Sequence, residues 1–126
     1  MNGYEVPAYL KGDPLPWLLE LDHDNPGVRY FVLRTLLDQP ADAPGVCQAR
    51  TAIMTTGPAP VILNAQAPDG AWLESTNGYQ ATFWQLIFLA ALGADPGDER
   101  VQRGCEYLLR HTLASNGAFA PGARPV

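Results

Sequence analysis

The sequence has no long hydrophobic run. Its longest wholly apolar stretch covers only residues 86–92, whereas a helix needs roughly twenty residues to cross a bilayer. Residues 1–7 lack the basic segment followed by an apolar one that marks a secretory signal. We therefore expect no membrane span and a cytoplasmic location.

Positive charge and cysteine are also scarce. Eight Lys and Arg stand against thirteen Asp and Glu, which gives a net charge of −5, and the cations form no run. A surface that follows phosphates needs clustered cations, so nucleic acid is not an expected partner. The two cysteines, Cys47 and Cys105, fall in different predicted helices without a pairing motif. Reduced thiols are therefore expected.

The residues that are present are typical of a folded helical chain. Hydrophobic residues make up 47% and charged residues 17%. Pro and Gly gather at breaks, which favours short elements joined by tight turns, and no stretch alternates apolar and polar residues long enough to demand a strand. We predict an all-α chain with an irregular arm over residues 1–13. The expected helices cover residues 15–21, 26–38, 44–56, 60–66, 79–92 and 96–113.

Local patterns also predict helix starts and buried faces. Asn25 and Asp95 each precede a proline, so both are expected N-caps. Helix 79–92 is apolar on nearly every side, which predicts burial on most sides. Cys105 falls in an apolar stripe, so we expect a buried, inert thiol. The expected buried face of helix 26–38 comprises Val28, Phe31, Val32, Thr35 and Leu36, widened by Tyr30, Leu33 and Leu37.

A short pattern occurs twice in the chain. An apolar stretch leads to a Gln, then to an Asp-Gly turn and a Trp, and a weaker copy follows 47 positions later. The matching residues are Gln66, Gly70 and Trp72 in the first copy and Gly117 and Phe119 in the second. Self-similarity at this period is typical of stacked helical pairs. We therefore expect a single helical-repeat domain over 1–126, with repeats at roughly 58–92 and 98–120.

These segments resemble the Q…G-x-W repeat of the terpenoid cyclase and protein prenyltransferase superfamily, which includes the squalene cyclases. Such a repeat typically begins with a basic residue, a small residue and an aromatic-aliphatic pair. Arg103-Gly104 and Tyr107-Leu108 match that start in the second copy, whereas Pro58-Ala59-Pro60 stands there in the first. Residues 17–56 also resemble the N-terminal helical part of small bacterial cyclase-like proteins of unassigned function. The resemblance implies stacked helical hairpins that form a partial α/α toroid.

In that family the repeats are thought to staple neighbouring helices, which is a structural role. A Gln at a helix C-terminus can donate to free carbonyls and reach a neighbouring helix start. A Trp after a glycine turn can lie over the helix end. The aromatic residues around the motif are expected either to pack in the core or to line an apolar pocket, in which cyclases stabilise carbocations. They are Trp72, Tyr79, Phe83, Trp84 and Phe88.

The catalytic signatures of the family are incomplete in this chain. Residues Asp22-His23-Asp24-Asn25 resemble the D-x-D-D acid motif of squalene cyclases but lack its last Asp. They precede a predicted helix start, where Asp24 and Asn25 are natural capping residues. Cys105 and His111 are six positions apart, so they do not share a helix face as zinc ligands would need to. We predict no catalytic residues, no metal and no cofactor.

These observations favour a non-catalytic or orphan cyclase-like helical-repeat domain that packs or binds through an apolar groove. Two alternatives stay open: a terpenoid cyclase or related isoprenoid-processing enzyme, which rests on fold analogy, and a helical-repeat protein interaction module. An exposed apolar helix face would favour the module. Helix 79–92 needs a cover, so we expect a homodimer, an apolar isoprenoid-like ligand or a continuation of the chain beyond Val126.

Overall fold

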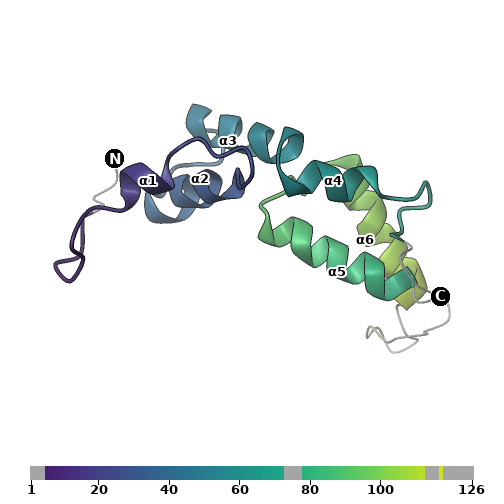
Figure 1. Cartoon of the computed structure of the whole chain (residues 1–126). Coiled ribbons are helices and arrows are strands. Elements are labelled where there is room, and N and C mark those ends of the chain that lie inside the picture. Colours follow the sequence, from purple (N-terminus) through teal and green to yellow (C-terminus); the bar gives the residue numbers. More distant parts are fainter. Residues whose placement is uncertain (1–4, 73–77, 113–116, 118–126) are drawn as a thin grey trace. The chain divides into compact units, whose positions relative to one another are not determined.

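The structure is a computed structural model that describes residues 5–72, 78–112 and 117, without the side chains of 78–80 and 112. Six α-helices and one π-helical turn make up the regular elements of these residues, and none of them forms a strand (Figure 1). The prediction of an all-α chain is therefore confirmed. The elements are α1 (Leu15–Leu18), α2 (Gly27–Phe31), η1 (Val32–Leu36), α3 (Pro44–Thr55), α4 (Pro58–Asn64), α5 (Gly78–Ala91) and α6 (Glu99–Thr112).

The chain divides into two compact units, Met1–Pro60 and Val61–Val126. In the first unit, α2 and η1 pack against α3. The apolar residues Val46, Ala49 and Ile53 recur at helical spacing along α3 and are all buried, as predicted. Arg50 of α3 lies over the ring of Tyr30 of α2, with its guanidinium carbon 4.4 Å from the ring centroid. This cation–π contact adds to the apolar core between the two segments.

The buried face of α2 and η1 differs from the predicted one. Val28, Phe31 and Leu36 are exposed, whereas Leu33 and Leu37, expected only to widen the face, are buried. Apolar residues surround most of this segment, so contact with α3 decides which of them form the core. The π-helical turn adds to the difference, because the Leu37 N–H donates to the carbonyl five residues back rather than four and shifts the side chains that follow.

Both predicted N-caps were wrong. The Asn25 side chain donates to Asp22 at 3.2 Å, and α2 begins after Pro26 without a side-chain cap. Asp98, rather than Asp95, caps α6, because its carboxylate accepts the Arg100 N–H at 2.9 Å. The Asp95 carbonyl instead accepts the Asp98 N–H at 3.1 Å. This turn delays the start of the helix by three residues.

In the second unit, α5 packs against α6. Gly93 follows α5 with a φ of 82°, which is the left-handed conformation expected of a glycine that ends a helix. α1 is shorter than predicted, because it ends at Leu18. α4 has the predicted length but lies two residues earlier than predicted, so it ends at Asn64, two residues before Gln66. No helix among the described residues has the length and apolar character needed to span a bilayer.

Candidate functional site

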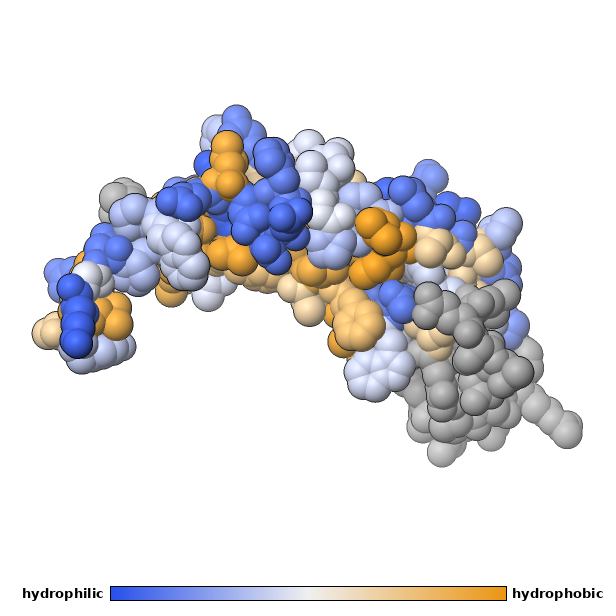
Figure 2. Space-filling view, viewed as in Figure 1, coloured by the Kyte–Doolittle hydropathy of each residue, from blue (hydrophilic) through white to orange (hydrophobic). Residues whose placement is uncertain are grey.

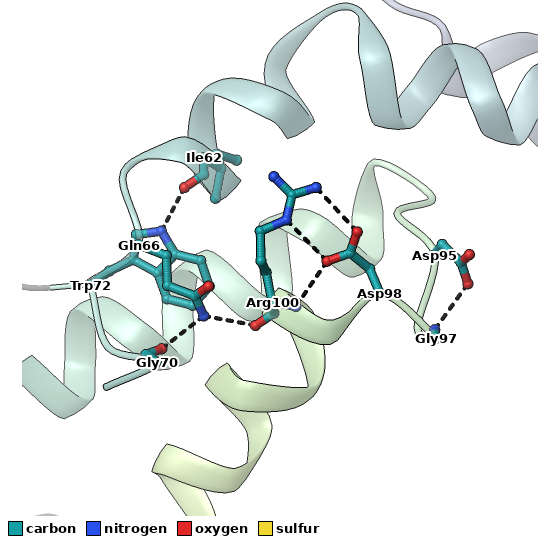
Figure 3. A network of polar contacts seen from close by, with 8 residues as sticks. All are labelled: Ile62, Gln66, Gly70, Trp72, Asp95, Gly97, Asp98 and Arg100. Atoms are coloured by element: carbon teal, nitrogen blue, oxygen red, sulfur yellow. Dashed lines mark hydrogen bonds and ion pairs between the residues drawn. The ribbon is translucent and has the colours of Figure 1, made fainter. Parts of the chain in front are cut away.

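The turn that follows α4 is held by the side chain of Gln66. Its amide nitrogen donates to the carbonyl of Gly70 at 3.0 Å and to the carbonyl of Arg100 at 2.7 Å (Figure 3). The first bond closes the turn on itself, and the second reaches the first turn of α6. One side chain therefore ties the exit of α4 to the beginning of α6, 34 residues further along the chain.

Trp72 ends the same turn and is almost fully buried, with 2% of its surface exposed. Its indole N–H donates to the carbonyl of Ile62 at 2.6 Å (Figure 3). That carbonyl lies in the last turn of α4 and also accepts the Ala65 N–H at 3.2 Å. The backbone N–H of Trp72 donates to the hydroxyl of Thr82 at 3.0 Å, and Thr82 is itself buried in α5. Trp72 thus connects α4 to α5.

Two glycines allow α6 to approach this turn closely. A Cβ on Gly70 would lie 2.5 Å from the carbonyl oxygen of Arg103, and the φ of Gly70 is 98°. A Cβ on Gly104 would lie 2.9 Å from the ring of Trp72 and 3.1 Å from Leu86 of α5. The Trp72 ring therefore occupies the space that a side chain at position 104 would need. We call this contact region, formed by residues 66–72 with Arg100, Arg103 and Gly104, the turn junction.

The turn junction joins the Gln66–Trp72 segment to the first turns of α6. Gly104 is the small residue of the predicted Arg103-Gly104 repeat start, so the sequence contained a signal for the close contact. Thr82 could also have been noticed, because it is one of few polar residues in α5. The carbonyl of Arg100 carries no sequence signal, since every residue has a carbonyl.

The second copy of the motif is described only at Gly117. Its φ of 84° lies in the same left-handed region as that of Gly70. Phe119 and the side chain of Tyr79 lie outside the described residues. Gly57 and Gly93 have the same left-handed conformation, which glycine adopts in tight turns generally.

The remaining aromatic residues form a surface stripe rather than a pocket with Trp72. Phe83, Trp84, Ile87 and Phe88 of α5 are 49%, 53%, 39% and 47% exposed. The rings of Phe83 and Trp84 meet edge to face with centroids 5.8 Å apart, and Trp84 stacks on Phe88 at 6.2 Å. Apolar surface over α5 is visible in Figure 2. We call these four side chains the apolar face.

The expected burial of α5 on most sides is therefore wrong for this chain taken alone. Thr82 and Leu89 are buried, and they lie on the side of α5 that faces the turn junction and α6. Phe83, Trp84, Ile87 and Phe88 lie on the opposite side of the helix and are each about half exposed. Four large apolar side chains consequently remain in contact with water.

The acidic segment at residues 22–25 is organised as a turn. The carboxylate of Asp22 accepts the backbone N–H groups of Asp24 at 2.9 Å and Asn25 at 3.1 Å. The hydrogen bond from the Asn25 side chain, together with these backbone bonds, lowers the pKa of Asp22 below its ordinary value. The carbonyls of His23 and Asp24 would lie 3.2 Å from a Cβ on Gly57. The segment therefore shapes the chain before α2.

Cys105 is exposed, which contradicts the expected buried thiol. The buried position of α6 at this level is Gly104, one residue earlier, because the Trp72 ring packs there. Among the described residues, no group of three or more His, Cys, Asp or Glu is placed to hold a metal ion. Cys47 is also exposed and free.

Each unit contains a shallow pocket lined by described residues. The pocket of the second unit has a volume of about 340 Å³ and is lined by acids as well as bases, so its charges largely cancel. Its lining residues are Pro68, Asp69, Arg103, Glu106, Tyr107, Arg110 and His111. The pocket of the first unit, about 290 Å³, is lined by Trp17, Leu18, Glu20, Asp22, Asn25 and Val28. Neither lining indicates one class of ligand.

No protein-family model, no curated protein and no solved structure matches this chain. Its family therefore stays a proposal, and the site has to be interpreted from its own geometry.

Proposed function

We propose that this chain is a helical-repeat binding module that works through the apolar face of α5. The observation that carries the proposal is the exposure of Phe83, Trp84, Ile87 and Phe88, which are 39–53% accessible on a single helix. Isolated apolar residues at a surface are ordinary, but a contiguous aromatic group is typical of an interaction site. Aromatic side chains also dominate the binding energy of protein interfaces.

Binding through this face would recover a considerable free energy. Covering a large apolar side chain fully contributes about 1.5–3 kcal/mol relative to leaving it in water. The four residues are already about half covered, so their completion would contribute roughly half of that each. A partner that buries all four would therefore gain several kcal/mol before the cost of association.

We further infer that the module belongs to the cyclase type of helical repeat, and the turn junction supports this inference. The Gln and Trp of the first copy contact the beginning of the second copy at Arg100 and Gly104. This is the stapling role that the resemblance implies for such a repeat. The polar groups of the motif are occupied by these contacts, which favours the scaffold role over contact with a ligand.

The binding of 8-anilinonaphthalene sulfonate, a dye that becomes fluorescent on apolar surfaces, tests the proposed function. Phe88→Glu should strongly reduce dye fluorescence at low protein concentration, because it places a charge inside the apolar face. Val61→Glu is the matched control, since Val61 is a helical apolar residue that is 70% exposed outside that face. Equal losses in the two variants, or no loss in either, would show that the apolar face has no special binding capacity.

A further inference from the structure

The apolar face contains no charge. None of the fourteen residues of α5 is Asp, Glu, Lys, Arg or His. A partner chosen by electrostatic complementarity would need opposite charges to meet, and this helix offers none. Recognition on this face therefore depends on shape and on apolar contact, which an identical face can provide equally well.

We propose that the apolar face of α5 binds the apolar face of a second copy of the chain, an inference that rests on the proposed function. In a two-fold arrangement, the same patch serves both sides of the contact. Each copy carries a net charge of −5, so two copies repel at long range. α5 itself contributes no charge to such a contact.

The geometry of the face fits a helix better than a small apolar ligand. Phe83, Trp84, Ile87 and Phe88 stand at positions i, i+1, i+4 and i+5, so they form one stripe along a single helix. Small-molecule sites are concave and bury most of the ligand, whereas these four side chains form a stripe along one helix and are 39–53% exposed. Two helices that pack at about 8–10 Å can interdigitate such stripes.

The size of the face sets the strength of the expected dimer. An aromatic side chain covers about 150–250 Å² when it is buried, so the four half-exposed residues offer roughly 400 Å² in each copy. Two copies then bury about 800 Å² through these side chains, which is below the roughly 1,200–2,000 Å² of stable complexes. We therefore expect a weak, reversible dimer rather than an obligate one.

Light scattering after size exclusion, with the full chain over a micromolar dilution series, tests this inference. The mass of the wild type should rise with concentration from 13.6 kDa toward the mass of two chains. Phe88→Glu should remain at 13.6 kDa throughout, whereas Val61→Glu should follow the wild type. A wild type that stays monomeric at every concentration, or a dimer that Phe88→Glu leaves intact, would overturn the inference.

Quenching of Trp84 by acrylamide separates this outcome from a failure of the proposed function. In a Trp17→Phe background the quenchable tryptophan is Trp84, because Trp72 is buried. Protection that grows with protein concentration supports the dimer, and protection that Phe88→Glu abolishes locates it on α5. A monomer whose Trp84 stays accessible and whose dye binding depends on Phe88 overturns the dimer alone. A monomer whose Trp84 is protected at all concentrations overturns both, because another part of the same chain then covers the face.

Protection of Trp84 by neutral phosphatidylcholine vesicles, in a chain that stays monomeric, would identify a lipid surface instead. That result would also overturn the second-copy inference while leaving binding through the apolar face in place.

Discussion

Replacement of Trp72 by Ala should strongly destabilise the protein. The ring is 2% exposed and fills the space against Gly104 and Leu86, so its removal leaves a cavity between α5 and α6. Truncation of a large buried aromatic residue typically costs about 3–5 kcal/mol. The change also removes the hydrogen bond from the indole N–H to the Ile62 carbonyl. A bond of this kind contributes about 0.5–1.5 kcal/mol, and it is part of the same total.

This loss is large compared with the stability of an ordinary domain, which is about 5–15 kcal/mol. Urea unfolding followed by far-ultraviolet circular dichroism is a suitable assay, because it does not depend on the fluorescence of the replaced residue. With a slope of about 1–3 kcal/mol per molar urea, the midpoint should fall by one to several molar units, or the variant should be partly unfolded in buffer.

Trp17→Ala is the matched control, since it makes the same chemical change at a residue that is 71% exposed. Surface substitutions of this kind usually change stability by no more than about 0.5 kcal/mol. Trp72→Phe separates the two contributions, because it keeps a ring but loses the indole N–H. Equal midpoints for Trp72→Ala and Trp17→Ala would refute the argument that the ring holds the turn junction together.

Two further predictions concern α6. Gly104→Ala should destabilise the protein by about 1–3 kcal/mol through overpacking against Trp72, although Gly to Ala within a helix is normally stabilising by about 0.5–1 kcal/mol. Gly45→Ala of α3 is the control and should be neutral or stabilising, because a Cβ there meets nothing closer than 3.7 Å. Urea midpoints that rise for both variants would contradict the close contact. The pKa of Asp98 is lowered from 3.8, first by the hydrogen bond from the Arg100 side chain, so its stabilisation of α6 is present above about pH 4 and is lost as the pH falls through the lowered value. Thermal melts from pH 6 to pH 2 should show a smaller acid loss in Asp98→Asn, which keeps a capping side chain without a titrating charge, and identical acid profiles would contradict this role.

Helices with clear ends could be predicted from the sequence. α3 agrees with its predicted range to within a residue, because Pro44 suits a first helical position and Gly57 stops the helix. Gly57 has a φ of 73°, which most residues avoid. α5 agrees to within one residue at each end, where Gly78 begins the helix and Gly93 follows it, whereas α6 begins three residues later than predicted. The local sequence contains what decides these boundaries.

The composition of the core was harder to predict because it depends on distant contacts. Cys105 and Gly104 are adjacent in the sequence, and the choice between them as the buried position depends on where the Trp72 ring lies, more than thirty residues earlier. The same applies to α2, where apolar residues surround the helix and only the position of α3 selects the buried ones. Helical periodicity locates a stripe but does not select one when most positions are apolar.

The exposure of one side of α5 could not be predicted by considering that helix alone. An apolar composition predicts burial, yet burial requires neighbours on every side, and α4 to α6 supply them on one side only. We expected apolar side chains of this helix to be partly exposed to water if nothing covered them, and four of them are 39–53% exposed. The toroid remains a prediction.

The arrangement of α5 separates its structural role from its proposed binding role. Thr82 and Leu89 anchor one side of the helix to the turn junction and α6, while Phe83, Trp84, Ile87 and Phe88 occupy the other. A charge at Phe88 replaces a side chain that is already 47% exposed, so it should remove association with little loss of folding. Loss of the Trp72 ring, by contrast, removes packing between the turn junction, α5 and α6, so it should also disturb the helix that carries the apolar face. Binding should therefore depend on both residues, but stability on Trp72 alone, and this asymmetry follows from the position of each ring relative to α6.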